Sequence, residues 1–161
     1  MDSPPRLRIG VVGAGRVGAV LGAALRAAGH NCIGVSAVSD LSCLRAAALL
    51  PGVPIKPADQ VVAESELLIL AVPDQVLPEL IRGFSSSEVF VPGQFVAHTS
   101  GSYGISVCDT APQISPMAIH PAMMKTGLGA TWVILESFLI GLFGGMAYGC
   151  KFFLLFFRPW T

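Results

Sequence analysis

The chain has 161 residues and a formal net charge of zero, with 12% charged and 53% hydrophobic residues. This length suits one domain and is short for two. The lack of a basic surplus argues against nucleic acid as a partner and favours a small molecule.

Expected elements of the first half alternate between short apolar runs and helical patterns. They are a strand over 7–12, a helix over 17–28, a strand over 32–35, a helix over 41–50 capped by Asp40, a short strand over 53–55 and one or two helical turns over 59–63. Gly29 follows the first helix, where a left-handed residue is favoured.

The second half continues the alternation with strands over 67–71, 95–98 and 117–120 and a helix over 76–81. The run Leu67–Ala71 is the most hydrophobic of these and is expected to be central. Strands that alternate with helices predict an α/β fold, here a doubly wound parallel sheet of five or six strands within residues 6–124.

A glycine-rich turn, Gly13-Ala14-Gly15-Arg16-Val17-Gly18, lies between the first strand and the first helix. It fits G-x-G-x-x-G in the context that favours dinucleotide binding rather than a plain flexible turn. Gly13 permits the tight turn, Gly15 lets the backbone approach a pyrophosphate, and Gly18 lets the helix pack closely. The amides at the helix start would then face the phosphates.

The end of the second strand bears on the choice between NAD and NADP. NAD sites commonly place a carboxylate there, but this chain has Ser36-Ala37-Val38-Ser39. Ser36 and Ser39 could donate hydrogen bonds to a 2′-phosphate, so NADP is favoured. Arg45 could assist from the next helix or lie on a solvated face, whereas Asp40 could replace the acid and weaken this preference.

Residues after the later strands are candidates for the rest of the site, because ligands bind at the carboxyl edge of such sheets. Val72 and Pro73 are expected near the ribose and nicotinamide, although an ordinary turn capped by Asp74 is the alternative. Ser100 and His120 are the candidate catalytic residues, one to bind substrate and one to orient it or donate a proton. We expect His98 to be a buried core histidine.

The four cysteines have neither the spacing of a metal knuckle nor that of a redox pair. We therefore expect free thiols in a reducing compartment and no metal site. Gly13, Gly15 and Arg16 interrupt the first apolar run too early for a signal peptide. These features favour a cytoplasmic protein.

Four segments together resemble a family of bacterial Rossmann-like proteins that carry a second, helical domain of unknown function. They are the glycine turn with its preceding strand, Ala71-Val72-Pro73-Asp74, His98-Thr99-Ser100-Gly101 and Ile119-His120-Pro121-Ala122-Met123. The family is related to pyrroline-5-carboxylate reductase, ketopantoate reductase and the 6-phosphogluconate dehydrogenase group. The resemblance covers roughly residues 6–124.

The resemblance implies an NAD(P)-dependent oxidoreductase that acts on a small carbonyl or imine compound. It implies cofactor contacts at Gly13, Gly15, Gly18, Val72 and Pro73, and substrate contacts at Ser100 and His120. In related enzymes a C-terminal helical domain closes the pocket and dimerisation is common, so a homodimer is compatible with the resemblance. The family pattern ends after Met124, and a non-catalytic NADP-binding remnant is therefore the alternative function.

Residues 125–161 form a hydrophobic tail with few charges, namely Lys125, Glu136, Lys151 and Arg158. Three interpretations stay open. The tail could be a membrane anchor that tethers the protein, although its uncharged stretch over 137–150 is shorter than a span needs. It could instead be a remnant that docks on the sheet. The abrupt loss of charge favours the third, degenerate or out-of-frame sequence.

Overall fold

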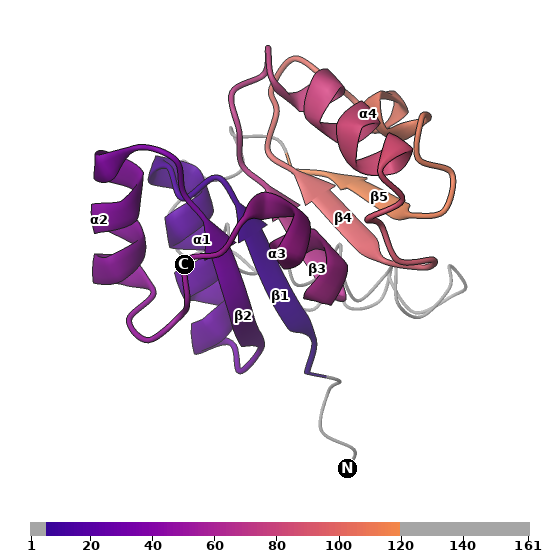
Figure 1. Cartoon of the computed structure of the whole chain (residues 1–161). Coiled ribbons are helices and arrows are strands. Elements are labelled where there is room, and N and C mark those ends of the chain that lie inside the picture. Colours follow the sequence, from indigo (N-terminus) through magenta and orange to yellow (C-terminus); the bar gives the residue numbers. More distant parts are fainter. Residues whose placement is uncertain (1–5, 120–161) are drawn as a thin grey trace, which may run out of the picture. The chain divides into compact units, whose positions relative to one another are not determined.

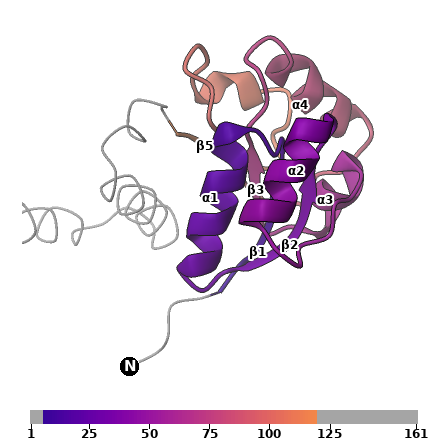
Figure 2. The same cartoon turned by 90° about the vertical axis from the view of Figure 1, so that its left-hand side faces the viewer.

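The computed structural model describes residues 6–119, and these form a parallel sheet with helices on both faces (Figures 1 and 2). The strand order is β2-β1-β3-β4-β5. The strands are β1 (Arg8–Val12), β2 (Asn31–Ser36), β3 (Leu67–Leu70), β4 (Phe95–His98) and β5 (Ser115–Ala118). The predicted doubly wound α/β fold is thus confirmed, with β3 in the centre of the sheet.

Five helical segments connect the strands. They are α1 (Arg16–Ala27), α2 (Asp40–Leu49), α3 (Ala58–Glu64), α4 (Leu77–Ser86) and the short 3-10 helix η1 (Ile105–Cys108). Figure 2 shows α1 on one face of the sheet and α3 on the other. This is the arrangement that right-handed crossovers produce when the chain moves from β1 to β2 and then back past β1 to β3.

The main core lies between the sheet and the α3–α4 layer. All four residues of β3 are buried, as a central parallel strand requires. Leu68 and Leu70 contribute to a cluster with Ile81 and Phe84 of α4, and the Phe84 ring meets that of Phe90 edge to face at 5.8 Å. Burial of these apolar side chains fixes α4 against β3 and β4, and therefore fixes the loops at the ends of both strands.

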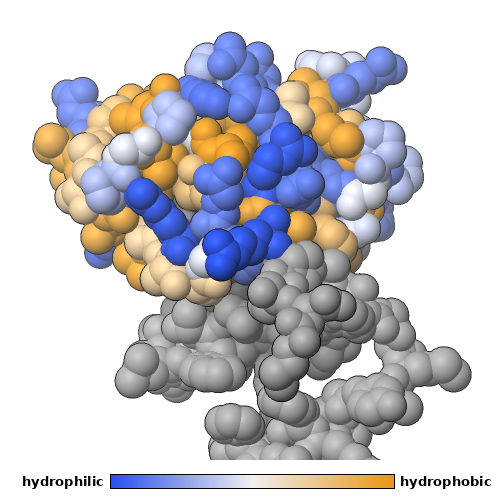
Figure 3. All heavy atoms as spheres, turned by 90° about the horizontal axis from the view of Figure 1, so that it is seen from below, coloured by the Kyte–Doolittle hydropathy of each residue, from blue (hydrophilic) through white to orange (hydrophobic). Residues whose placement is uncertain are grey.

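The last residues of the strands lie in one row across the sheet. Val12 pairs with Ser36 on one side and with Leu70 on the other, Leu70 pairs with His98, and His98 pairs with Ala118. The segments that follow the strands therefore emerge at the same edge. The opposite, amino edge has a surface on which hydrophilic and hydrophobic residues are mixed (Figure 3), and it carries the ion pairs Arg8–Glu66 and Lys56–Glu64.

Several boundaries differ from those expected from the sequence. The strand expected over 53–55 is reduced to a single bridge between Val35 and Ile55. The cap of α2 is Ser39 rather than Asp40, which is the first helical residue. The last described strand is Ser115–Ala118, two residues earlier than predicted. The proposed tail over 125–161 lies outside the described residues.

Candidate functional site: the carboxyl edge of the sheet

The glycine turn between β1 and α1 is held against the end of β3. Gly13 has a φ of +97°, and a Cβ at this position would overlap the carbonyl oxygen of Ala71. A Cβ on Gly18 would overlap the carbonyl oxygen of Gly13 and lie 2.8 Å from the Cβ of Ala71. Both glycines are thus required by the packing of the protein itself, Gly13 for the turn and Gly18 for the close approach of α1.

Gly15 is different, because nothing inside the domain requires a glycine there. Its φ of −73° and ψ of −166° are open to any residue. An added Cβ would meet no described atom within 4 Å and would project into open space. The space in front of Gly15 is where a phosphate could approach the backbone.

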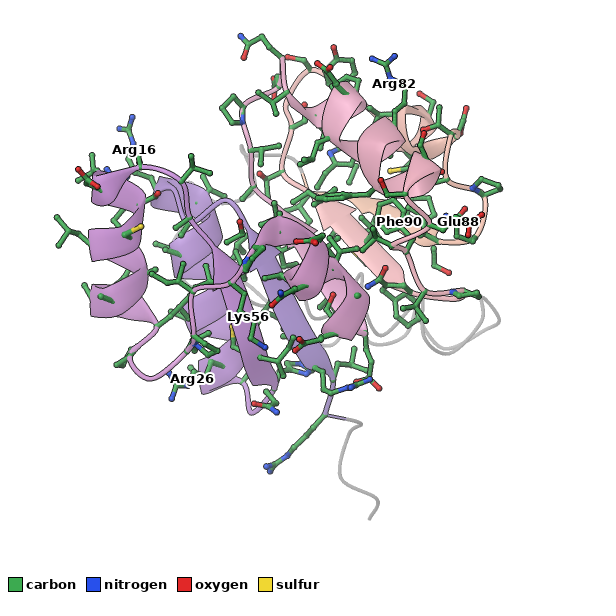
Figure 4. The ribbon with its side chains drawn as sticks, in the orientation of Figure 1. Arg16, Arg26, Lys56, Arg82, Glu88 and Phe90 are labelled. Atoms are coloured by element: carbon green, nitrogen blue, oxygen red, sulfur yellow. The ribbon has the colours of Figure 1, made fainter. Side chains whose placement is uncertain are left out.

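The N-terminal end of α1 has no internal cap. Among residues 6–119, no side chain accepts a hydrogen bond from its first amides, and its first turn holds no acidic residue. Helix geometry leaves these amides without intrahelical acceptors and places a partial positive charge at this end. Arg16, the first residue of α1, is exposed and points away from the ribbon (Figure 4). The residues around Gly15, Arg16 and Val17 can therefore receive an anion.

The other two amides of the predicted turn face inward. The backbone nitrogens of Gly13 and Ala14 donate to the carbonyl oxygen of Ser36, at 3.0 and 3.2 Å. These bonds tie the turn to the end of β2 and aim the following residues outward. Gly13 and Ala14 would therefore shape a phosphate site, while the helix end that follows would contact the ligand.

The end of β2 carries the two serines considered for the ribose. Ser36 is buried, whereas Ser39 is exposed at the start of α2. The Ser39 hydroxyl accepts from the Ser42 amide at 3.2 Å, and the Ser42 hydroxyl accepts from the Ser39 amide at 3.0 Å. Ser39 is therefore the more accessible of the two. Arg45 is half-buried in α2.

The ends of β3 and β4 bring the remaining candidates to the same edge. Val72 is half-buried and Pro73 is exposed just after β3, while Ser100 is buried just after β4. The Oγ of Ser100 accepts hydrogen bonds from the amides of Ser102 and Tyr103, both at 3.1 Å. His120 lies outside the described residues, so the structure does not place it relative to Ser100.

Asp74 joins this edge, although the sequence suggested it only as the cap of a turn. Its Oδ2 accepts a hydrogen bond from the hydroxyl of Ser102 at 2.5 Å. The hydroxyls of Ser102 and Ser100 together hold the pKa of Asp74 below its usual value. A short sequence pattern could not reveal this contact, because it joins residues 28 positions apart and depends on the pairing of β3 with β4.

His98, the last residue of β4, is fully buried as expected. Burial lowers the pKa of its imidazole, while the backbone of Gly104 and, more weakly, the carboxylate of Asp74 oppose that shift. Nδ1 accepts from the Ser100 amide at 3.4 Å, and Nε2 forms no hydrogen bond with the described residues. His98 thus contacts an amide of the loop that follows β4.

Other features of residues 6–119 lie away from this edge or are absent. Surface hollows of about 310 and 680 Å³ lie along α4, and the glycine turn lines neither of them. Within this part of the chain, no cluster of three His, Cys, Asp or Glu side chains is suited to a metal ion. Its helices are also too short or too polar to cross a bilayer.

Comparison with known proteins gives a consistent fold. Residues 2–121 match the model of the Rossmann-like domain. Among solved structures, 3-hydroxyisobutyrate dehydrogenase from Mycobacterium tuberculosis, determined with L-serine, is 22% identical with a TM-score of 0.59, covering 72% of this chain and 40% of that one. No curated protein matches the sequence.

Two further structures agree. Prephenate dehydrogenase from A. aeolicus, in complex with hydroxyphenyl propionate and NAD+, is 14% identical with a TM-score of 0.58, over 71% of this chain and 42% of that one. The conserved protein MTH1747, described as similar to 3-hydroxyacid dehydrogenases, is 22% identical with a TM-score of 0.59, over 75% and 46%.

This chain thus spans less than half the length of each of these three proteins, and at such identities the likeness establishes the fold. The family match covers most of the chain and agrees with the parallel sheet and the glycine turn after β1. The chain belongs to the Rossmann-like domain family.

Proposed function

We propose that this chain is the cofactor-binding part of an NAD(P)-dependent oxidoreductase, with NADP as the favoured cofactor. The observation that carries the proposal is the open N-terminal end of α1. Gly15 leaves space in front of amides that no side chain of the described part of the chain caps, and a Cβ would occupy part of that space. A pyrophosphate satisfies both features, since it requires close backbone approach and hydrogen-bond donors.

The residues for the two halves of the cofactor follow from the row of strand ends. Gly15, Arg16 and Val17 would hold the pyrophosphate at the start of α1. The adenosine half would lie over the end of β2, and the nicotinamide half beyond Val72 and Pro73 at the ends of β3 and β4. When bound, the nicotinamide supplies hydride transfer, and we propose a small carbonyl or imine compound as the substrate class.

NADP is favoured because no carboxylate lies between Ser36 and Ser39. A carboxylate would repel a 2′-phosphate, whereas the exposed hydroxyl of Ser39 is compatible with one. A Ser39→Asp variant sharpens this proposal. Aspartate still caps a helix, so α2 should stay folded, while the preference for NADPH over NADH should fall. Unchanged relative affinities would contradict the assignment of Ser39.

Ser100 and His120 remain our proposed substrate-side residues. The buried Ser100 hydroxyl is fixed by two backbone amides, so it is pre-positioned rather than mobile. We propose that Ser100 orients the substrate and that His120 holds or donates a proton. Ser100→Ala and His120→Ala should each lower turnover without abolishing cofactor binding.

The decisive experiment is a fluorescence titration of the full chain with NADPH and NADH, followed by assay of NADPH consumption with a panel of small carbonyl and imine compounds. Saturable binding with turnover supports the enzyme. Binding without turnover on any compound would support a cofactor-binding remnant instead. No binding of either nucleotide would overturn the proposed function.

A further inference from the structure

Two loops from neighbouring strands are joined at the carboxyl edge by a hydrogen bond between Asp74 and Ser102, and the proposed reaction gives neither of these side chains a role. Asp74 belongs to the loop after β3, and Ser102 to the loop after β4. The Ser102 hydroxyl donates to Asp74 Oδ2 at 2.5 Å, and this bond connects residues 28 positions apart. We call Asp74, Ser100 and Ser102 the strand-end latch.

Ser100 forms the centre of the strand-end latch. Its Oγ accepts hydrogen bonds from the amides of Ser102 and Tyr103, which closes a tight turn over residues 100–103. The hydroxyl is then left with one hydrogen to donate. The hydroxyls of Ser102 and Ser100 both favour the ionised form of the Asp74 carboxylate, which lowers its pKa. The turn is thus closed by amides on one side and anchored by a carboxylate on the other.

The strand-end latch rests on a buried residue of β4. His98 is fully buried, and its Nδ1 accepts from the amide of Ser100 at 3.4 Å. Because Nδ1 accepts this hydrogen bond, Nδ1 itself carries no proton. His98 is itself paired in register with Leu70 at the end of β3. The loops after β3 and β4 therefore start from paired residues of the sheet. The hydrogen bond between Ser102 and Asp74 joins the two loops a second time, beyond the strand ends.

We propose that Asp74 is a positioning residue, which fixes the turn over residues 100–103 against the nicotinamide half of the cofactor. The inference rests on the proposed function. The strand order reverses between β1 and β3, so a dinucleotide laid across that crevice has one half over β2 and the other over β3 and β4. Asp74 directly follows Pro73 on the second side, in the loop after β3.

The test compares two ligands that differ only in the nicotinamide. NADPH and 2′-phospho-ADP-ribose are titrated against the full chain and against the Asp74→Ala, Ser102→Ala and Ser102→Thr variants. Asp109→Asn is the matched control, because Asp109 is an exposed aspartate in the same domain, at the end of η1. Amide exchange of Ser102 and Tyr103, measured by NMR, reports whether the turn is held.

Asp74→Ala and Ser102→Ala should each lower the affinity for NADPH about fivefold, which is the effect of one lost hydrogen bond. The affinity for 2′-phospho-ADP-ribose should stay unchanged in both variants. Both should speed exchange at the Ser102 and Tyr103 amides. Ser102→Thr retains the hydroxyl and should restore the affinity for NADPH, and Asp109→Asn should match the original chain.

An equal loss of affinity for both ligands, or no change in either affinity, would overturn the positioning role of Asp74. Neither result would contradict the proposed pyrophosphate site. Unchanged amide exchange in Asp74→Ala would overturn it as well. If the original chain bound neither ligand, the proposed function would fall and the role of Asp74 would fall with it.

Discussion

The helices α1 and α2 begin at the same edge of the sheet, yet their N-terminal ends are finished in opposite ways. In α2, Ser39 and Ser42 exchange hydrogen bonds between side chain and backbone, so the helix caps itself. In α1, Gly15 occupies the equivalent position and provides no side chain at all. The first amides of α2 are thus capped by its own side chains, whereas those of α1 are available to water or a ligand.

The comparison separates structural glycines from a functional one. Within a single turn, Gly13 and Gly18 are required because a Cβ would overlap backbone oxygens. Gly15 meets no such obstacle and has an ordinary backbone conformation. The domain itself would accept a larger residue at position 15, and the helix that starts there lacks a cap. Both features indicate a site for a ligand.

Gly13→Ala should have the largest effect, because it breaks the turn from which α1 starts. Positive φ and overlap with the Ala71 carbonyl act together, and we expect the free energy of unfolding to fall by about 3 kcal/mol. Urea unfolding followed by circular dichroism measures it. Gly52→Ala is the control, since Gly52 also has a positive φ of 79° but no neighbour within 4 Å. Equal losses in both variants would show that overlap contributes nothing.

Gly15→Val should affect binding without affecting the fold. We expect NADPH affinity to fall at least tenfold, about 1.4 kcal/mol, while the free energy of unfolding changes by less than about 0.5 kcal/mol. Gly83→Val is the matched control, because Gly83 is equally open but lies in α4. If the Gly15→Val variant bound NADPH as tightly as the original chain, the start of α1 would not be the pyrophosphate site.

Ser39→Ala addresses the other half of the comparison and should have the smallest effect. Removing the cap leaves an amide of α2 without its acceptor, which costs about 1 kcal/mol of folding free energy. Ser39→Asp, measured in the same urea experiment, should retain most of that stability. A stable Ser39→Ala variant would mean that water caps α2 as well as the hydroxyl does.

Much of the fold could be predicted from local patterns. The apolar run of β3 and the position of the glycine turn both led to the correct architecture, because burial and backbone freedom are properties of short segments. The packing role of Gly18 against the β1 turn was also predictable. The cap of α2 was assigned to Asp40 instead of Ser39, because both residues favour caps and only the helical geometry separates them.

The strand-end latch could not be predicted. Asp74 and Ser102 belong to different loops, and their contact exists only because β3 and β4 pair in register. Local patterns do not indicate that the Ser100 hydroxyl is held by the backbone of its own turn either. Contacts of this kind depend on long-range pairing, which a pattern of neighbouring residues does not contain.

If a ligand binds the uncapped start of α1, the free energy of unfolding of this domain depends on the concentration of that ligand. A ligand that binds only the folded state adds free energy according to its concentration, about 2.7 kcal/mol at one hundred times its Kd. A helix end completed by a diffusible nucleotide would then resist heat and proteases to a degree set by the nucleotide supply. The melting temperature of the protein would then rise with the cellular concentration of the cofactor, because the open site at Gly15 admits it.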